Sequence, residues 1–179
     1  LAVYPIAMFP QREHLMLVLT IPYLLVASGR ADGEDLSKRL KIVTGVMAGF
    51  GFAMKPYFLP IPLFVELYVL SQRGLRSSLA DPAPWSVLAV CVAHALFAVI
   101  VTPEYFTVVL PLARAFYSEV SQNPWIDLAL SANLGPPTII LPLLGVATLA
   151  VRSHLARVIF LAALGGLASA YAQGKGWPY

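Results

Sequence analysis

The sequence predicts an all-α membrane protein, a polytopic bundle of about six transmembrane helices that forms one domain over residues 1–179. Of the 179 residues, 59% are hydrophobic and 12% are charged, and the mean hydropathy is +0.76. A soluble domain carries about 25% charged residues, so a soluble globule is excluded. The chain also holds six apolar stretches, each near the ~20 residues that cross the hydrocarbon layer. Because it begins at Leu1 without a signal-peptide pattern and stops just after an apolar run, we expect it to be part of a longer protein.

The second and third stretches adjoin each other at a proline-rich junction. Lys55-Pro56-Tyr57 separates them, and Pro60 and Pro62 follow. Proline disfavours helix in the residue before it and removes a helical hydrogen bond, so we expect a tight hairpin and a short third helix. The expected spans cover residues 13–29, 40–56, 57–71, 85–103, 134–151 and 157–173.

The longest connection, residues 103–133, is too apolar to be a free linker. It carries Tyr105, Phe106 and Trp125 among few charges. Aromatic side chains with a polar tip are favoured at the membrane–water interface. We therefore expect one or two interfacial helices here.

Alternate connections differ in positive charge, which indicates the orientation. One set holds eight of the twelve Lys and Arg residues and the other set holds four. Cytoplasmic loops retain Lys and Arg, so the richer set is predicted to be cytoplasmic. The four outer cations are Arg12, Lys55, Arg114 and Lys175.

Polar residues at the outer ends of the predicted spans form the main candidate site. Three cations at one depth are able to hold a phosphate through charge-assisted hydrogen bonds, and an anionic lipid head is the natural ligand. The alternative is that each cation reaches lipid headgroups and pairs with a neighbouring acid. The residues are Arg12, Glu13 and His14 at the first span, Lys55 after the second, Glu104 after the fourth and Lys175 after the sixth.

Two ionisable residues, Glu66 and His94, fall inside predicted spans. Such residues are costly in hydrocarbon and usually face a partner. We expect a hydrogen bond between them. A proton or ion path needs more acids than these spans hold, which disfavours a transporter.

Other chemistries have little support. The Lys and Arg residues are scattered over every connection, so nucleic acid is not an expected partner. The single Cys91 lies in an apolar run and cannot form an internal disulfide. The sequence has no Ser-His-Asp, HExxH or Walker pattern, so it points to no metal and to no particular cofactor.

Three segments together resemble the type-C membrane glycosyltransferases of bacteria. They are Gln11-Arg12-Glu13-His14-Leu15 leading into Ile21-Pro22-Tyr23-Leu24-Leu25, Lys55-Pro56-Tyr57-Phe58 with Glu66-Leu67, and Gly174-Lys175-Gly176-Trp177-Pro178-Tyr179. The resemblance implies a bundle in the bacterial inner membrane that takes a sugar from a polyprenyl-phosphate donor.

The same resemblance implies roles for the outer polar residues. Arg12, Lys55 and Lys175 would contact the donor phosphate, with His14 or Glu13 nearby. The family's usual acidic pair in the first outer loop is not visible in this sequence. Glu13 is then the first candidate general base and Glu104 the second.

Three functions follow in order of preference. The first is a glycosyltransferase, or a fragment of one, that uses a lipid-phosphate-linked sugar on the extracytoplasmic side. The alternative is a non-enzymatic accessory subunit that packs against other membrane protein chains. A small transporter is third. The expected partners are membrane lipids, a lipid-linked sugar and other membrane chains.

Overall fold

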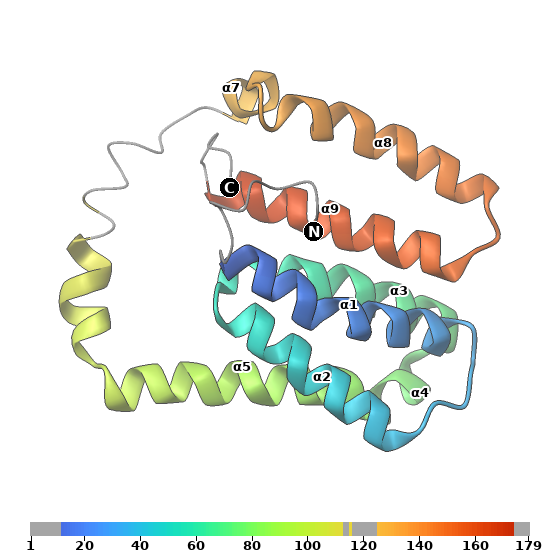
Figure 1. Ribbon diagram of the computed structural model, residues 1–179, viewed down its shortest axis with the longest axis horizontal. Helices are drawn as coiled ribbons and strands as arrows, with labels where there is room; N and C mark the ends of the chain where they lie inside the picture. Colours follow the sequence, from blue (N-terminus) through green and yellow to red (C-terminus); the bar gives the residue numbers. More distant parts are fainter. Residues whose placement is uncertain (1–11, 113–114, 116–124, 174–179) are drawn as a thin grey trace.

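The computed structural model describes residues 12–112, 115 and 125–173, with side chains from His14 onward. In this part of the chain all regular structure is helical (Figure 1), which confirms the all-α prediction. The α-helices are α1 (Arg12–Ala31), α2 (Lys38–Ala53), α3 (Pro60–Arg73), α4 (Leu75–Leu79), α5 (Pro82–Val101), α7 (Trp125–Leu130), α8 (Gly135–Ala150) and α9 (His154–Gln173). A 3-10 turn, η2 (Pro56–Phe58), and a π-helical turn, η3 (Tyr105–Val109), complete them.

The long helices alternate in direction and so give the bundle two ends (Figure 1). We call one the Lys55 end, where α1, α3 and α8 begin and α2, α5 and α9 finish. We call the other the Arg30 end, where α1, α3 and α8 finish and α2, α5 and α9 begin. Every long helix therefore places its first and last residues at opposite ends.

Three of the described helices are long and apolar enough to cross a membrane, which indicates a membrane protein. They are His14–Ala31, Pro82–Val101 and His154–Gln173. Helices α2, α3 and α8 have 16, 14 and 16 residues and are shorter than a standard span. The structure therefore does not confirm six spans.

Local sequence signals set the helix boundaries. Ser37 caps α2 by accepting a hydrogen bond from Leu40 N–H at 3.3 Å, and Asp81 caps α5 by accepting one from Ala83 N–H at 3.0 Å. Gly74 ends α3 with a φ of 78°, a conformation that favours glycine. Between α2 and α3, extended Lys55 leads into η2, so the chain makes the tight hairpin that the prolines predict.

The core lies among α1, α2, α3, α5 and α9. Tyr23 and Phe52 are fully buried and meet edge to face, with ring centroids 6.4 Å apart. Glycines bring the helix backbones close together. A Cβ added at Gly45 of α2 would lie 2.6 Å from the carbonyl oxygen of Ala83, and one added at Gly165 of α9 would lie 2.6 Å from Ile61 Cα.

The 103–133 connection is partly helical, as predicted. Its described parts include η3 and α7, in which Tyr105, Phe106 and Trp125 are exposed. Their depth relative to a membrane remains a prediction.

Candidate functional site

Helix packing brings together, at the Lys55 end, the helix ends that carry or precede the predicted site segments. A Cβ added at Gly51 of α2 would lie 3.3 Å from the carbonyl oxygen of Met16, so the end of α2 lies beside the start of α1. Helix α9 meets the start of α3 at Gly165 and Ile61, and it also contacts η2. The first turn of α1, the corner that carries Lys55 and the last turns of α9 are therefore neighbours.

Lys55 and His14 are described at this end with their side chains. The ammonium of Lys55 lies 5.4 Å from the centroid of the Phe58 ring, close enough for a cation–π contact. His14 is in the first turn of α1 and is 7% exposed. The ammonium of Lys55 therefore lies at the corner between α2 and α3, whereas the His14 side chain is buried at the start of α1.

Three further members of the predicted phosphate and base set fall at the edges of the described residues. Arg12 and Glu13 belong to the first turn of α1, where the structure describes their backbone and not their side chains. Lys175 also lies outside them, two positions beyond Gln173, where α9 ends. Their roles remain predictions.

An apolar pocket of about 550 Å³ lies at the corner between α2 and α3, although Lys55 itself is not one of its lining residues. Met54 and Pro56, the neighbours of Lys55 in the chain, both line the pocket. The walls come from α2, η2, α5 and η3, and His94 and Tyr105 supply polar atoms. A concave, mostly apolar site with few polar groups is typical of a ligand pocket, and this one suits a hydrocarbon chain.

Glu104 and Glu13, the two candidate bases, lie at different places. Glu104 is exposed and directly precedes η3, whose Tyr105 lines the pocket. The segment around η3 projects from the end of α5, apart from the start of α1 (Figure 1). One acid therefore lies near the pocket and the other belongs to the first turn of α1.

The expected hydrogen bond between Glu66 and His94 is wrong. Glu66 Oε1 accepts from Tyr23 Oη at 2.5 Å and from Arg30 Nη1 at 2.7 Å, and Oε2 accepts from Arg30 Nη2 at 2.9 Å. His94 instead lines the pocket at the Lys55 end. A bidentate guanidinium is a strong partner for a carboxylate, and the carboxylate oxygens of Glu66 bond to residues of α1 rather than to His94 of α5.

Glu66 belongs to a larger charged group at the Arg30 end. Arg30 is fully buried, and its Nε lies 3.1 Å from Asp81 Oδ2. Asp81 Oδ2 also lies 3.0 Å from Arg73 Nη1 and 3.5 Å from Lys41 Nζ. This group, which we call the Arg30 cluster, consists of Tyr23, Arg30, Lys41, Glu66, Arg73 and Asp81.

The Arg30 cluster keeps Asp81 ionised. Burial by itself would raise the pKa of Asp81. The hydrogen bond from Ala83 N–H and the charges of Arg30 and Lys41 together outweigh burial, so the pKa of Asp81 lies below its ordinary value. The cluster ties α1, α2 and α3 to the start of α5.

The sequence did not predict that Arg30, Arg73 and Asp81 share a site, although the spacing of the polar residues on α1 and α3 indicates one. Tyr23 and Arg30 are seven residues apart on α1, and so are Glu66 and Arg73 on α3. Residues separated by two helical turns share a face. Two polar pairs with this spacing on neighbouring apolar helices indicate a shared polar contact.

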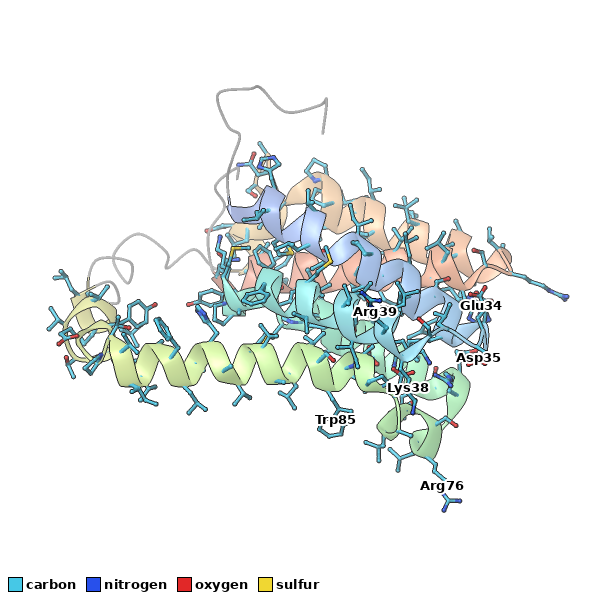
Figure 2. The ribbon with its side chains drawn as sticks, turned by 60° about the horizontal axis from the view of Figure 1, so that its bottom comes forward. Glu34, Asp35, Lys38, Arg39, Arg76 and Trp85 are labelled. Carbon is cyan, nitrogen blue, oxygen red and sulfur yellow. The ribbon has the colours of Figure 1, made fainter. Side chains whose placement is uncertain are left out.

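Further charged side chains surround the cluster at the protein surface. Figure 2 shows Glu34, Asp35, Lys38, Arg39 and Arg76 gathered at the Arg30 end, with Trp85 pointing outward from α5 nearby. The described structure thus has one end rich in charge and another end at which an apolar pocket lies at the corner that carries Lys55.

Comparisons with known protein families, with curated proteins and with solved structures give no match for this chain.

Proposed function

We propose that this protein is a membrane glycosyltransferase, or a fragment of one, that takes its sugar from a lipid-phosphate donor at the Lys55 end. The observation that supports this proposal is an apolar pocket of about 550 Å³ that is lined by Met54 and Pro56, the residues on either side of Lys55. A lipid-linked donor needs a cation for its phosphate and an apolar surface for its chain. Lys55 supplies the cation, and the pocket between α2 and α5 supplies the surface.

The mechanism depends on positioning and charge. Lys55, with Arg12 and Lys175 in the predicted arrangement, holds the donor phosphate and stabilises the negative charge that develops on it as the glycosidic bond breaks. Glu13 or Glu104 accepts the proton of the acceptor hydroxyl. His14 lies in the first turn of α1, where it would orient Glu13 or the phosphate.

The orientation in the membrane is part of the same proposal. We propose that all six long helices cross the bilayer, with the Lys55 end outside the bacterial inner membrane and the Arg30 end in the cytoplasm. Support comes from charge: the helix ends and connections at the Arg30 end carry eight of the twelve Lys and Arg residues, and the cytoplasmic side favours these residues.

Binding of undecaprenyl phosphate to the protein in lipid nanodiscs tests this function. Removal of one charge-assisted hydrogen bond costs about 1.5–3 kcal/mol, so Lys55→Ala is expected to weaken binding at least tenfold. Lys38→Ala is the matched control, because Lys38 is an exposed lysine at the opposite end, and it is expected to bind as the unmodified protein does. Equal binding by the two variants would contradict the proposal.

A non-enzymatic accessory subunit is the second candidate, favoured by one observation. Only 6% of the α5 span is buried within the described structure, and Ile100 near its end is 73% exposed. Either a partner chain or lipid is able to cover such a face. This candidate predicts that undecaprenyl phosphate does not bind and that cysteine cross-linking from the outer half of α5 reaches another protein.

A further inference from the structure

A groove between α3, α4 and α5 opens at the Arg30 end, away from Lys55. It has a volume of about 290 Å³, and its walls are leucines, a proline and Trp85. Two polar residues, Glu66 and Ser78, also line it. We call it the Ser78 groove.

The carboxylate of Glu66 is fixed in orientation and still has an acceptor position. Tyr23 and Arg30 donate two hydrogen bonds to Oε1 and one to Oε2. A carboxylate has about four acceptor positions, so one position on Oε2 is open among the described residues. The side chain is 20% exposed, which gives a ligand access to it.

Ser78 brings an unused hydroxyl to the same groove. The residue is 8% exposed, and its Oγ has no hydrogen-bond partner in the described part of the chain. Other helical hydroxyls in this structure bond to the carbonyl four residues earlier, as Ser169 does to Gly165, whereas the Ser78 hydroxyl makes no such bond. Buried hydroxyls without a partner are rare, so the Ser78 hydroxyl points to a ligand.

Glu66 and Ser78 are connected through one guanidinium. The Ser78 carbonyl accepts from Asp81 N–H at 3.2 Å, and Asp81 and Glu66 both contact Arg30. Both polar residues that line the groove therefore also border the Arg30 cluster.

Charge decides which head group fits. Three cations, Arg30, Lys41 and Arg73, face two acids, Glu66 and Asp81, so the cluster disfavours an ammonium. The carboxylate of Glu66 lines the groove and disfavours a carboxylate or phosphate. An uncharged hydroxyl suits both residues, because a hydroxyl donates to a carboxylate and accepts from a serine. We infer that the Ser78 groove binds the hydroxyl head of an uncharged membrane amphiphile, with the hydrocarbon chain along its leucines.

Quenching of Trp85 fluorescence tests this site, because Trp85 lines the groove and is 48% exposed. The protein with Trp125→Phe and Trp177→Phe in nanodiscs retains Trp85 as its single tryptophan. Titration with dibrominated octadecanol is expected to quench it at about tenfold lower concentration than the matching methyl ether, which cannot donate to Glu66.

Ser78→Ala is expected to raise the half-quenching concentration of the alcohol about tenfold and to leave that of the ether unchanged. Ser77→Ala is the matched control, because Ser77 is the exposed neighbour on the same short helix. Equal quenching by alcohol and ether, or equal titrations for the two serine variants, would overturn the proposal, and so would stronger quenching by the dibrominated carboxylic acid. Lys55→Ala is expected to leave this titration unchanged, which separates it from the phosphate site.

Discussion

Arg30 is the central residue of the buried charged cluster, because it contacts both of its acids. Arg30 has no exposed surface, and it contacts Glu66 with two nitrogens and Asp81 with the third. Removing ions from water is costly, and the cost is offset only where geometry and hydrogen bonding are good. The loss of one partner from such a group leaves a buried charge uncompensated, so these residues are the sites most sensitive to neutral substitution.

We predict that Asp81→Asn destabilises the protein by about 3 kcal/mol at neutral pH. The change removes one carboxylate charge from among Arg30, Lys41 and Arg73, and breaking a buried ion pair costs about 3–5 kcal/mol. Asparagine is also a good helix cap, so the effect reports the charge rather than the start of α5. Unfolding in mixed micelles measures it.

The pH dependence of unfolding follows from the same carboxylate. The pKa of Asp81 is lowered in the folded protein, so its stabilisation is fully present above the unfolded value of about 3.9 and is lost as the pH falls through the lower folded value. The difference in stability between the unmodified protein and Asp81→Asn is therefore expected to shrink on acidification below about pH 4. Asp35→Asn, at an exposed site, is the control and should cost less than about 0.5 kcal/mol. A constant difference for Asp81→Asn across this pH range would contradict the assignment.

At the scale of helices, close contact between backbones holds α9 against α3. A Cβ at Gly165 would approach Ile61 Cα, Ile61 N and the carbonyl carbon of Pro60 at 2.6, 2.8 and 2.9 Å. All three are backbone atoms, which cannot move aside as a side chain does. At the adjacent Gly166, a Cβ would meet nothing within 4 Å. The two glycines thus differ in function although they are neighbours in the sequence.

We predict that Gly165→Ala destabilises the protein by about 2 kcal/mol, because overpacking of a close contact typically costs 1–3 kcal/mol. Gly166→Ala is the matched control and should be neutral or slightly stabilising, since alanine favours helix more than glycine does. Thermal unfolding of the two variants in the same detergent compares them. A similar loss in both would show that helix propensity, and not the contact with Ile61, governs this position.

At the scale of the whole molecule, the two ends differ in chemistry. The Arg30 end holds the buried charged cluster and the surface charges of Figure 2, whereas the Lys55 end holds an apolar pocket at the corner that carries Lys55. The proposed six-span topology places the two ends of the bundle on opposite sides of the membrane. Tyr57 and Arg76 are exposed residues at opposite ends, so they are suitable reporters.

Cysteine labelling in intact cells tests this topology. In a background with Cys91→Ala, a membrane-impermeant maleimide added outside is expected to label Tyr57→Cys and not Arg76→Cys. Permeabilised cells provide the control, in which both variants should react. Labelling of Arg76→Cys alone in intact cells would reverse the orientation and end the proposal for an outer phosphate site.

Much of the fold was predictable because its signals are local. The apolar stretch 13–29 became α1, and 157–173 became the greater part of α9, since hydrophobic runs and caps act over a few residues. The hairpin after Lys55 follows from prolines that exclude regular helix. The third helix is short, as expected, but it is displaced from the predicted 57–71 to Pro60–Arg73.

The sequence by itself determined that the described part of the chain is helical, where most of its helices begin and end, and that Lys55 lies at a corner between α2 and α3. Only the tertiary structure decided which polar groups meet. Glu66 bonds to Arg30 rather than to His94, Asp81 joins three helices through their cations, and Gly165 rather than Gly166 contacts α3. Helical periodicity shows which residues share a face, but the partner of each face depends on how helices far apart in the sequence pack together.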